Sequence, residues 1–172
     1  RRGERPNPEV RLHVGGANRW VTWPAWPVAT ETRVAFPQDD GSLPETPPEG
    51  GRSWQEVFHN PLKPPRSRGG ATLAPDAGAF SSKGNETQDS SLVFLSEPWS
   101  KTDVIAGSVG LYASLRSVRR DAQLGLRLWD VRPDGSATTI TEGVLRLCDR
   151  LEGEVQDVYL EALPICYEVK AG

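Results

Sequence analysis

Apolar and polar residues alternate in four segments of the chain. The segments cover residues 10–14, 109–116, 157–162 and 165–170. In the first of them, Val10, Leu12 and Val14 alternate with Arg11 and His13. A period of two places apolar side chains on one face of a strand and polar side chains on the other. The four segments therefore predict strands of a sheet that turns one face to the solvent.

Two further runs are more continuously apolar, which indicates strands that are more buried than the four above. These runs cover residues 92–95 and 124–131. Weaker strand signals lie at residues 32–36, 54–58, 137–141 and 144–147. The whole pattern predicts eight to ten short strands, enough for two antiparallel sheets packed face to face.

The glycine and proline content excludes a helical bundle. The 17 glycines and 15 prolines make up nearly a fifth of the 172 residues, whereas about 12% is average. Inside a helix each proline costs about 3 kcal/mol and each glycine about 1 kcal/mol. The longest stretch without either residue runs only from Leu111 to Leu124. We predict an all-β fold with less than about 10% helix.

Turn sequences separate the predicted strands. Asp39-Asp40-Gly41 and Arg132-Pro133-Asp134-Gly135 are typical turns, because proline presets φ and glycine accepts a positive φ. Between residues 60 and 91, proline and glycine recur around a polar stretch. This segment predicts a Pro/Gly-rich loop of about 30 residues, and loops of that length in compact domains are usually functional or disordered.

The charge pattern excludes some partners. Twenty basic and 23 acidic residues give a net charge of −3, which provides no basic field for nucleic acid. No run of apolar residues is long enough to predict a membrane span. The chain begins Arg1-Arg2-Gly3, lacks a signal-peptide pattern and contains no methionine. We expect it to be a piece of a longer polypeptide.

The sequence offers no complete catalytic or metal site. Its two histidines, His13 and His59, accompany no Gly-x-Ser-x-Gly nucleophile motif, and residues 107–110 come nearest without its spacing. Cys148 and Cys166 match no metal-ligand spacing. We therefore predict no catalytic residue, no metal and no cofactor in this chain, and two ordinary thiols that are buried or half-buried.

Carboxylates gather at the predicted turns, as at Asp39, Asp40, Asp130 and Asp134. Solvated turn caps are the simplest interpretation. A structural calcium ion held by such oxygen ligands is the alternative.

Six tryptophans are the most conspicuous side chains. Trp20, Trp23 and Trp26 fall within seven residues, and Trp54, Trp99 and Trp129 are dispersed. Three interpretations remain open. They are core residues, anchors in an interface with another domain, or a platform that stacks on sugars in a free-standing carbohydrate-binding module.

Several motifs occur in order along the chain. A Gly-x-Asn-x-Trp turn within residues 10–20 is followed by Trp26-Pro27, by residues 40–43, by residues 59–70 and by residues 92–109. Residues 128–135 and 143–146 are the most specific pieces. From about residue 10 to residue 172, this ordered set resembles the C-terminal, non-catalytic domain of serine hydrolases of the X-prolyl dipeptidyl-peptidase and cocaine-esterase type. Asp121-Ala122-Gln123-Leu124 departs from the family pattern. A second departure is at the end, where the sequence resembles a family domain that lacks its final strand or strands.

The resemblance implies a jelly-roll-like, galactose-binding-like β-sandwich attached to an α/β-hydrolase domain that carries the catalytic serine, acid and histidine. No catalytic residue can therefore be carried over to this chain. The implied partner is that hydrolase domain, whose active-site entrance the sandwich helps to shape, and homo-oligomers are also implied. The family activities are release of X-Pro dipeptides, ester hydrolysis and β-lactam-related acyl transfer.

The resemblance also suggests which residues face the implied hydrolase domain. We expect the tryptophan-rich turn and the long loop to form one face toward it. The residues expected to line this interface or the active-site entrance are Trp20, Trp23, Trp26, Trp54 and His59.

Overall fold

The computed structural model describes residues 9–28, 31–50, 54–60, 62, 81–83, 91–148 and 152–172. Every regular element within these ranges is a β-strand, and none of their residues is helical. The predicted all-β class is therefore confirmed. No helix in the described ranges is long and apolar enough to cross a membrane.

Nine strands are formed by the described residues. They are β1 (Val10–Val14), β2 (Arg19–Trp23), β3 (Ser81–Lys83), β4 (Asp103–Gly107), β5 (Gly110–Arg116), β6 (Ala122–Val131), β7 (Ser136–Leu147), β8 (Val155–Glu161) and β9 (Ile165–Val169). All pairings between these strands are antiparallel: β1 with β2, β4 with β9, β5 with β8, and β7 with both β3 and β6.

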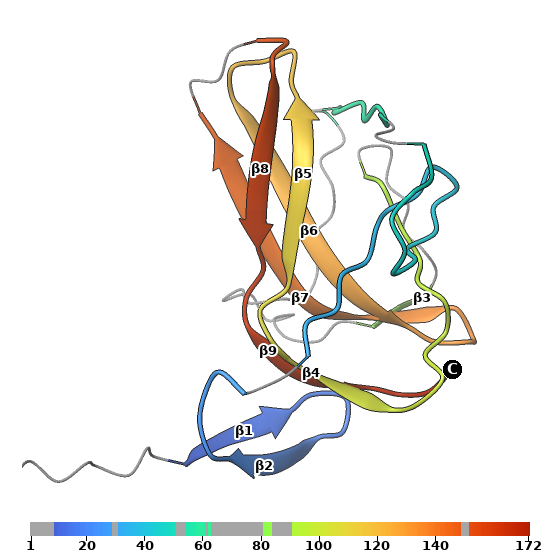
Figure 1. Cartoon of the computed structure of the whole chain (residues 1–172), viewed down its shortest axis with the longest axis vertical. Coiled ribbons are helices and arrows are strands. Elements are labelled where there is room, and N and C mark those ends of the chain that lie inside the picture. The colour runs from blue at the N-terminus through green and yellow to red at the C-terminus, as the bar shows by residue number, and fades with distance from the viewer. Residues whose placement is uncertain are drawn as a thin grey trace, which may run out of the picture.

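Two layers face one another in the upper part of the molecule (Figure 1). Strands β5 and β8 lie in front of the sheet of β3, β7 and β6. The connection after β8 joins the layers, because the Thr141 hydroxyl donates to the Leu163 carbonyl at 2.8 Å. At the same place Gly143 lacks the Cβ that would overlap the backbone of Glu161 and Ala162. The arrangement is a β-sandwich, and its jelly-roll connectivity stays a prediction.

Below the two layers, the strand pair β4–β9 continues the strand pair β5–β8. Strand β4 leads into β5 and β8 leads into β9, so the pairs β5–β8 and β4–β9 follow one another along the same two chain segments. The hairpin of β1 and β2 lies against β9 at the lower end (Figure 1).

The core agrees with the predicted alternations. On β8 and just after it, Val158, Leu160 and Ala162 are buried, whereas Asp157, Tyr159 and Glu161 are exposed. The buried apolar residues of the described chain come from five parts of the sequence and are Val14, Ala106, Ala137, Leu147, Val158, Leu160, Ala162 and Tyr167. Few residues are thus fully removed from water, so each one carries a large share of the stability.

Several strand predictions are confirmed and others are wrong. Residues 137–141 and 144–147 belong to one strand, β7, which is the middle strand of its sheet and pairs with both β3 and β6. Residues 32–36, 54–58 and 92–95 form no strand, and the expected burial of the last segment is also wrong, because Leu92, Val93 and Leu95 are 40–45% exposed. In the last of these, only Leu95 exchanges backbone hydrogen bonds, donating to Gly41 and accepting from Leu43, both at 2.8 Å. A strand needs a continuing ladder of such bonds, which this segment lacks among the described residues.

The long loop prediction needs a correction as well. Most of residues 60–91 lie outside the described residues, but Ser81–Lys83 forms β3, which pairs with β7. The two predicted turns are confirmed. Gly41 and Gly135 have φ values of 84° and 77°, which glycine adopts without strain.

Candidate interaction surfaces

The β1–β2 hairpin has two different faces. The pairing sets His13 opposite Trp20 and Leu12 opposite Val21. Directly paired residues share a face, so Leu12, Val21 and Trp23 form an apolar face that is half-buried. His13 and Trp20 lie on the opposite face, which is exposed. The hairpin therefore presents an aromatic side chain to the solvent while an apolar face is only partly covered.

Trp20 is the centre of the exposed face. Its side chain is 60% exposed, and the Arg11 guanidinium lies 5.4 Å from the centroid of its ring. The His13 ring meets the Trp20 ring edge-on with a centroid separation of 5.3 Å. His13 Nε2 and Asn18 Oδ1 are 3.0 Å apart. Arginine and histidine thus hold the indole in place by a cation–π contact and an aromatic contact.

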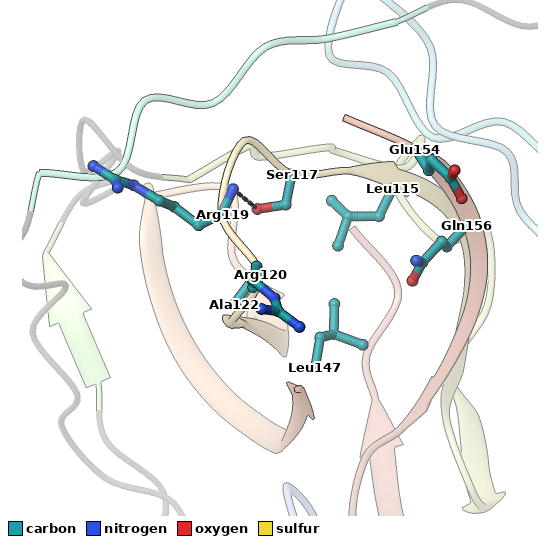
Figure 2. A pocket seen from close by; sticks show the side chains of 8 residues that line it. All are labelled: Leu115, Ser117, Arg119, Arg120, Ala122, Leu147, Glu154 and Gln156. Carbon is teal, nitrogen blue, oxygen red and sulfur yellow. Dashed lines mark hydrogen bonds between the residues drawn. The ribbon is translucent and has the colours of Figure 1, made fainter. Parts of the chain in front are cut away.

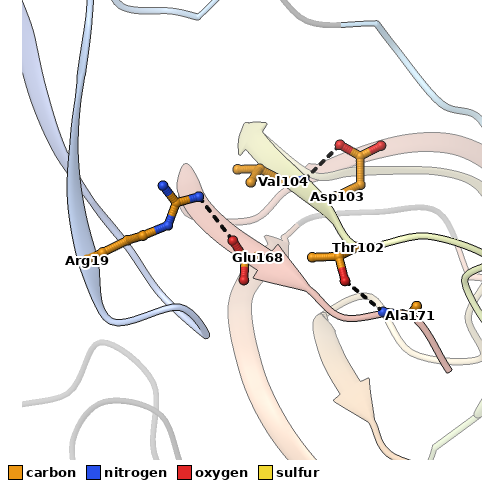
Figure 3. A network of polar contacts seen from close by, with 6 residues as sticks. All are labelled: Arg19, Thr102, Asp103, Val104, Glu168 and Ala171. Atoms are coloured by element: carbon orange, nitrogen blue, oxygen red, sulfur yellow. Dashed lines mark hydrogen bonds and ion pairs between the residues drawn. The ribbon is translucent and has the colours of Figure 1, made fainter.

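Strand β9 anchors the hairpin to the sandwich. The Gly15 N–H donates to the Cys166 carbonyl at 2.9 Å, and the Glu168 N–H donates to the Gly15 carbonyl at 2.8 Å. Arg19 forms an ion pair with Glu168 at 3.1 Å, which Figure 3 shows together with the hydrogen bond from Ala171 to Thr102 at the end of β9. The ring of Tyr167 leaves no space for a side chain at Gly15. Glycine at this turn is therefore required by the close approach of β9.

Tyr167 joins the anchor to the main sheet. Its hydroxyl donates to Asp130 Oδ2 at 2.9 Å. Burial, followed by the hydrogen bond and the charge of Asp130, raises the pKa of Tyr167 to about 12. The phenol is therefore held in its protonated, donating form up to strongly alkaline pH.

This raised pKa makes a prediction about stability. In the unfolded chain Tyr167 titrates near its ordinary pKa of about 10, so its contribution is fully present below pH 10. Above pH 10 the unfolded state releases the proton first, and the contribution falls by about 1.4 kcal/mol per pH unit until the folded state also titrates. We expect Tyr167→Phe to be less stable than the unsubstituted chain by about 2 kcal/mol at pH 8.

The difference between the two proteins is the quantity to measure, by urea unfolding from pH 8 to pH 11.5. It should shrink as the pH rises through 10. A difference that stays constant over this range would contradict the role given to the Tyr167 proton.

The expected interface residues fall into two groups. Trp20 and Trp23 lie on β2, and Trp26 lies in the bend that follows, where it is 39% exposed. Trp54, 56% exposed, lies 6.0 Å from the guanidinium of Arg116 at the end of β5. That end is opposite the hairpin along the longest axis of the molecule (Figure 1).

His59 is exposed and belongs to the same short segment as Trp54, residues 54–60. The structure therefore brings together Trp20, Trp23 and Trp26, and it separates them from Trp54 and His59. These residues do not share one face, because Trp54 lies beside Arg116 at the end of the sandwich opposite the hairpin. The role of each residue at an interface or entrance stays a prediction.

No constellation for catalysis assembles among the described residues. Ser108 lies in the short connection between β4 and β5, so it is not presented on a turn from a strand to a helix. No three side chains of His, Cys, Asp or Glu in the described ranges are grouped to hold a metal ion. Asp40 and Asp134 act as turn caps: each accepts a hydrogen bond from the N–H two residues later at 2.9 Å. Hydrogen bonds from Ser42 and Ser136 lower the pKa of these carboxyls.

The two thiols differ from one another. Cys166 is half-buried as expected, and burial raises the pKa of its thiol, while the Arg19 charge partly opposes that shift. Cys148 is exposed, so the prediction that both thiols are buried or half-buried is wrong for it. It follows the last residue of β7, where the strand leaves the core.

A small pocket lies at the upper end of the sandwich (Figure 2). Leu115 and Leu147 form its floor, and Arg120, Glu154 and Gln156 surround them. Its volume is about 10 Å³, which is room for no more than one water molecule. The pocket therefore has no space for a substrate or a cofactor.

Sequence reasoning missed several residues that the structure makes important. Arg11 was placed on a polar strand face, but the alternation alone does not show that its guanidinium covers Trp20. The alternations at residues 109–116 and 157–162 likewise put Tyr112 and Tyr159 on the polar faces of their strands. Only the register shows that they are direct neighbours across β5 and β8. Each alternation shows that its tyrosine lies on a polar face, but neither shows which residues pair across the two strands.

The described fold is thus an antiparallel β-sandwich with exposed aromatic surfaces and without an assembled catalytic site in its described part. A sequence model of the X-Pro dipeptidyl-peptidase C-terminal non-catalytic domain family matches residues 4–172. The chain belongs to this family. It is also 27% identical over 173 residues to a protein named cocaine esterase from Rhodococcus sp. (strain MB1 Bresler), a match that covers 94% of this chain. The chain spans 30% of the length of that relative.

Proposed function

We propose that this chain is a single non-catalytic accessory domain of a serine hydrolase, and that it packs on an α/β-hydrolase catalytic domain of the same polypeptide. The family membership supports this function. The relative named cocaine esterase supports an esterase or dipeptidyl-peptidase as the parent class. In this role the domain helps to shape the entrance of the active site, and it contributes to homo-oligomers where the parent forms them.

The observation that carries the proposal is the β1–β2 hairpin surface, which we define as Trp20, Trp23 and Trp26. All three side chains lie within this hairpin and the bend that follows it, with Trp20 on the exposed face, Trp23 on the half-buried face and Trp26 39% exposed. Tryptophan is enriched at the centres of interfaces, where it buries a large area. Grouped apolar exposure of this kind marks an interaction site more often than an ordinary surface.

The alternative of a sugar-binding platform has less support. The Arg11 guanidinium already lies over the ring of Trp20, and Trp23 points to the half-buried face of the hairpin. A sugar ring needs an open aromatic face, and these contacts reduce the area that is available for stacking.

The proposal predicts a difference between the whole protein and this chain alone. Trp20→Ser and Trp26→Ser should each lower the free energy of unfolding of the full-length protein by about 2 kcal/mol, because each removes about 100 Å² of contact with the catalytic domain. In the chain alone the same changes should cost about 1 kcal/mol or less, since Trp20 is 60% and Trp26 39% exposed there and exposed contacts such as that of Arg11 with Trp20 are weak.

The measurement is thermal and urea unfolding of both proteins with each variant. Val118→Ser is the matched control, because Val118 is 82% exposed and lies away from the hairpin between β5 and β6. Equal losses in the two proteins would argue against docking through the hairpin. A parent reading frame without a Gly-x-Ser-x-Gly motif before Arg1 would refute the hydrolase assignment itself.

A further inference from the structure

A second exposed aromatic group lies on the outer face of the β5–β8 pair, away from the hairpin. Tyr112 and Tyr159 are directly opposite in the register. Their ring centroids are 4.4 Å apart with an interplanar angle of 32°. Tyr112 is 81% exposed and Tyr159 is 45% exposed. Two stacked aromatic rings in contact with solvent are unusual on a surface that has no partner.

Gly110 fixes the position of this pair. The ring of Tyr159 lies directly over its backbone, and a Cβ at Gly110 would come within 2.6 Å of the Tyr159 ring. Tyr112 packs against the same ring from the position directly across the strand pair. A ring in contact with a glycine backbone and with a second ring has reduced rotational freedom, so it loses less entropy when a ligand binds.

Two carboxylates flank the rings on the same strand face. Asp157 and Glu161 lie two residues before and two residues after Tyr159, so all three side chains point outward. Asp157 accepts a hydrogen bond from the Ser114 hydroxyl at 2.6 Å, which fixes its position. Within the described ranges neither carboxylate forms an ion pair. Partial burial together with the negative charge of Glu161 raises the pKa of Tyr159, in agreement with a negative local potential.

An open groove with apolar and acidic lining adjoins the rings through Glu161. Val144, Leu163 and Pro164 line it, together with Gly143 and two carboxylates, and its volume is about 450 Å³. Glu142 in this groove is paired with Arg127 at 3.0 Å, whereas Glu161 is not paired among the described residues. We call the rings, the two flanking carboxylates and the groove the tyrosine surface.

We propose that the tyrosine surface binds an extended segment of another protein, in which an arginine lies three or four residues from an apolar side chain. An arginine can stack on the open ring of Tyr112 and pair with Glu161 or Asp157, which complements the charge of this face. The apolar side chain would enter the groove beside Val144 and Leu163. Glu161 at the edge of the groove lies two residues along β8 from Tyr159. An extended segment rises roughly 3.3 Å per residue, so three or four of its residues reach from the rings past Glu161 into the groove.

Neutral sugars fit this surface less well. The two rings stack on one another and do not form a broad flat platform, and two carboxylates without cations favour a positively charged ligand.

The proposal concerns a face that differs from the hairpin surface. Because the test uses this chain alone, its failure would leave the proposed docking on a catalytic domain unaffected.

The test uses a capped tetrapeptide of arginine, threonine, proline and leucine, titrated into the 172-residue chain and followed by the ring-proton NMR signals of Tyr112 and Tyr159. We expect saturable shifts in the millimolar range or tighter, weakened by added salt. Tyr112→Leu and Glu161→Gln should each weaken binding about threefold to tenfold. The same peptide with citrulline in place of arginine should lose at least as much, because it keeps the shape without the charge.

Glu154→Gln and Val118→Ser are the matched controls, since both positions are exposed and lie outside the tyrosine surface, and they should leave binding unchanged. The inference is overturned if the citrulline peptide binds equally well, if the controls weaken binding as much as Tyr112→Leu, or if no shift appears at 10 mM peptide, a concentration far above a roughly millimolar Kd. Shifts caused by cellohexaose and not by the arginine peptide would overturn it in favour of a sugar site.

Discussion

Leu160→Ala is expected to destabilise the chain by about 2–5 kcal/mol, because it leaves a cavity at the centre of a thin core. Leu160 is only 2% exposed and is paired with Leu111 across β8 and β5. Its side chain lies between the two layers, where few other residues are fully buried. Such a loss is a large fraction of the total stability of an ordinary domain, which is about 5–15 kcal/mol.

Urea unfolding followed by far-UV circular dichroism measures this loss, with Val155→Ala as the control. Val155 belongs to the same strand but is half-exposed, so its truncation should cost less than about 1 kcal/mol. If both variants lose the same free energy, the outer and inner faces of β8 are not different, and the two-layer arrangement is wrong.

The alternation of apolar and polar residues predicted the strands that have one buried face and one solvent-exposed face. In β8 the inward residues Gln156, Val158 and Leu160 are half-buried or buried and the others are exposed, because the facing sheet covers one side of the strand and water covers the other. The same reasoning worked for β1 and β9, whose bounds match the predicted segments within a residue. Local pattern was sufficient in these cases because the burial that selects it is a property of each strand face.

The pattern was insufficient where strand formation depends on a partner. Residues 92–95 are more apolar than β2, yet they form a single bridge while β2 forms five pairs with β1. The difference comes from the turn that begins at Gly16 and folds β2 back onto β1, whereas the described residues 96–100 that follow 92–95 form no tight turn. Hydrophobicity alone does not provide the hydrogen-bonded neighbour that a strand requires.

The surfaces show the same limit. The tryptophans near residue 20 were predicted to act together with Trp54, but Trp54 lies at the other end of the sandwich next to Arg116. Residue type carried no information about this separation. By contrast, Trp20, Trp23 and Trp26 stay in one part of the structure, because a single hairpin and its following bend contain them. Short sequence distance therefore predicted which tryptophans share a structural element, whereas residue type did not predict where Trp54 lies.

Gly16→Ala is the second large effect that the structure predicts. Gly16 has a φ of 76°, and a Cβ at this position would overlap the carbonyl oxygen of Glu168. Both the left-handed backbone and the overlap disfavour alanine, so we expect a loss of about 2–4 kcal/mol. Because the overlap is with backbone, rotation of a side chain cannot relieve it.

Gly153→Ala separates the two causes. Gly153 has nearly the same φ, 75°, but nothing lies within 4 Å of its absent Cβ. It should lose only the conformational part, about 1–2 kcal/mol. A loss for Gly16→Ala no larger than this would show that contact with β9 does not hold the hairpin.

Hydrogen exchange locates the effect of Gly16→Ala in the molecule. The amides of Gly15 and Glu168 donate across the joint between the hairpin and β9, so their exchange should accelerate strongly in Gly16→Ala and stay unchanged in Gly153→Ala. The hairpin that carries Trp20 would then be released from the sandwich while the two layers above it stay folded. Because Arg19 and Glu168 connect across the same joint, their ion pair should be lost with it, and the exposed tryptophans would no longer be held in a fixed position relative to the core.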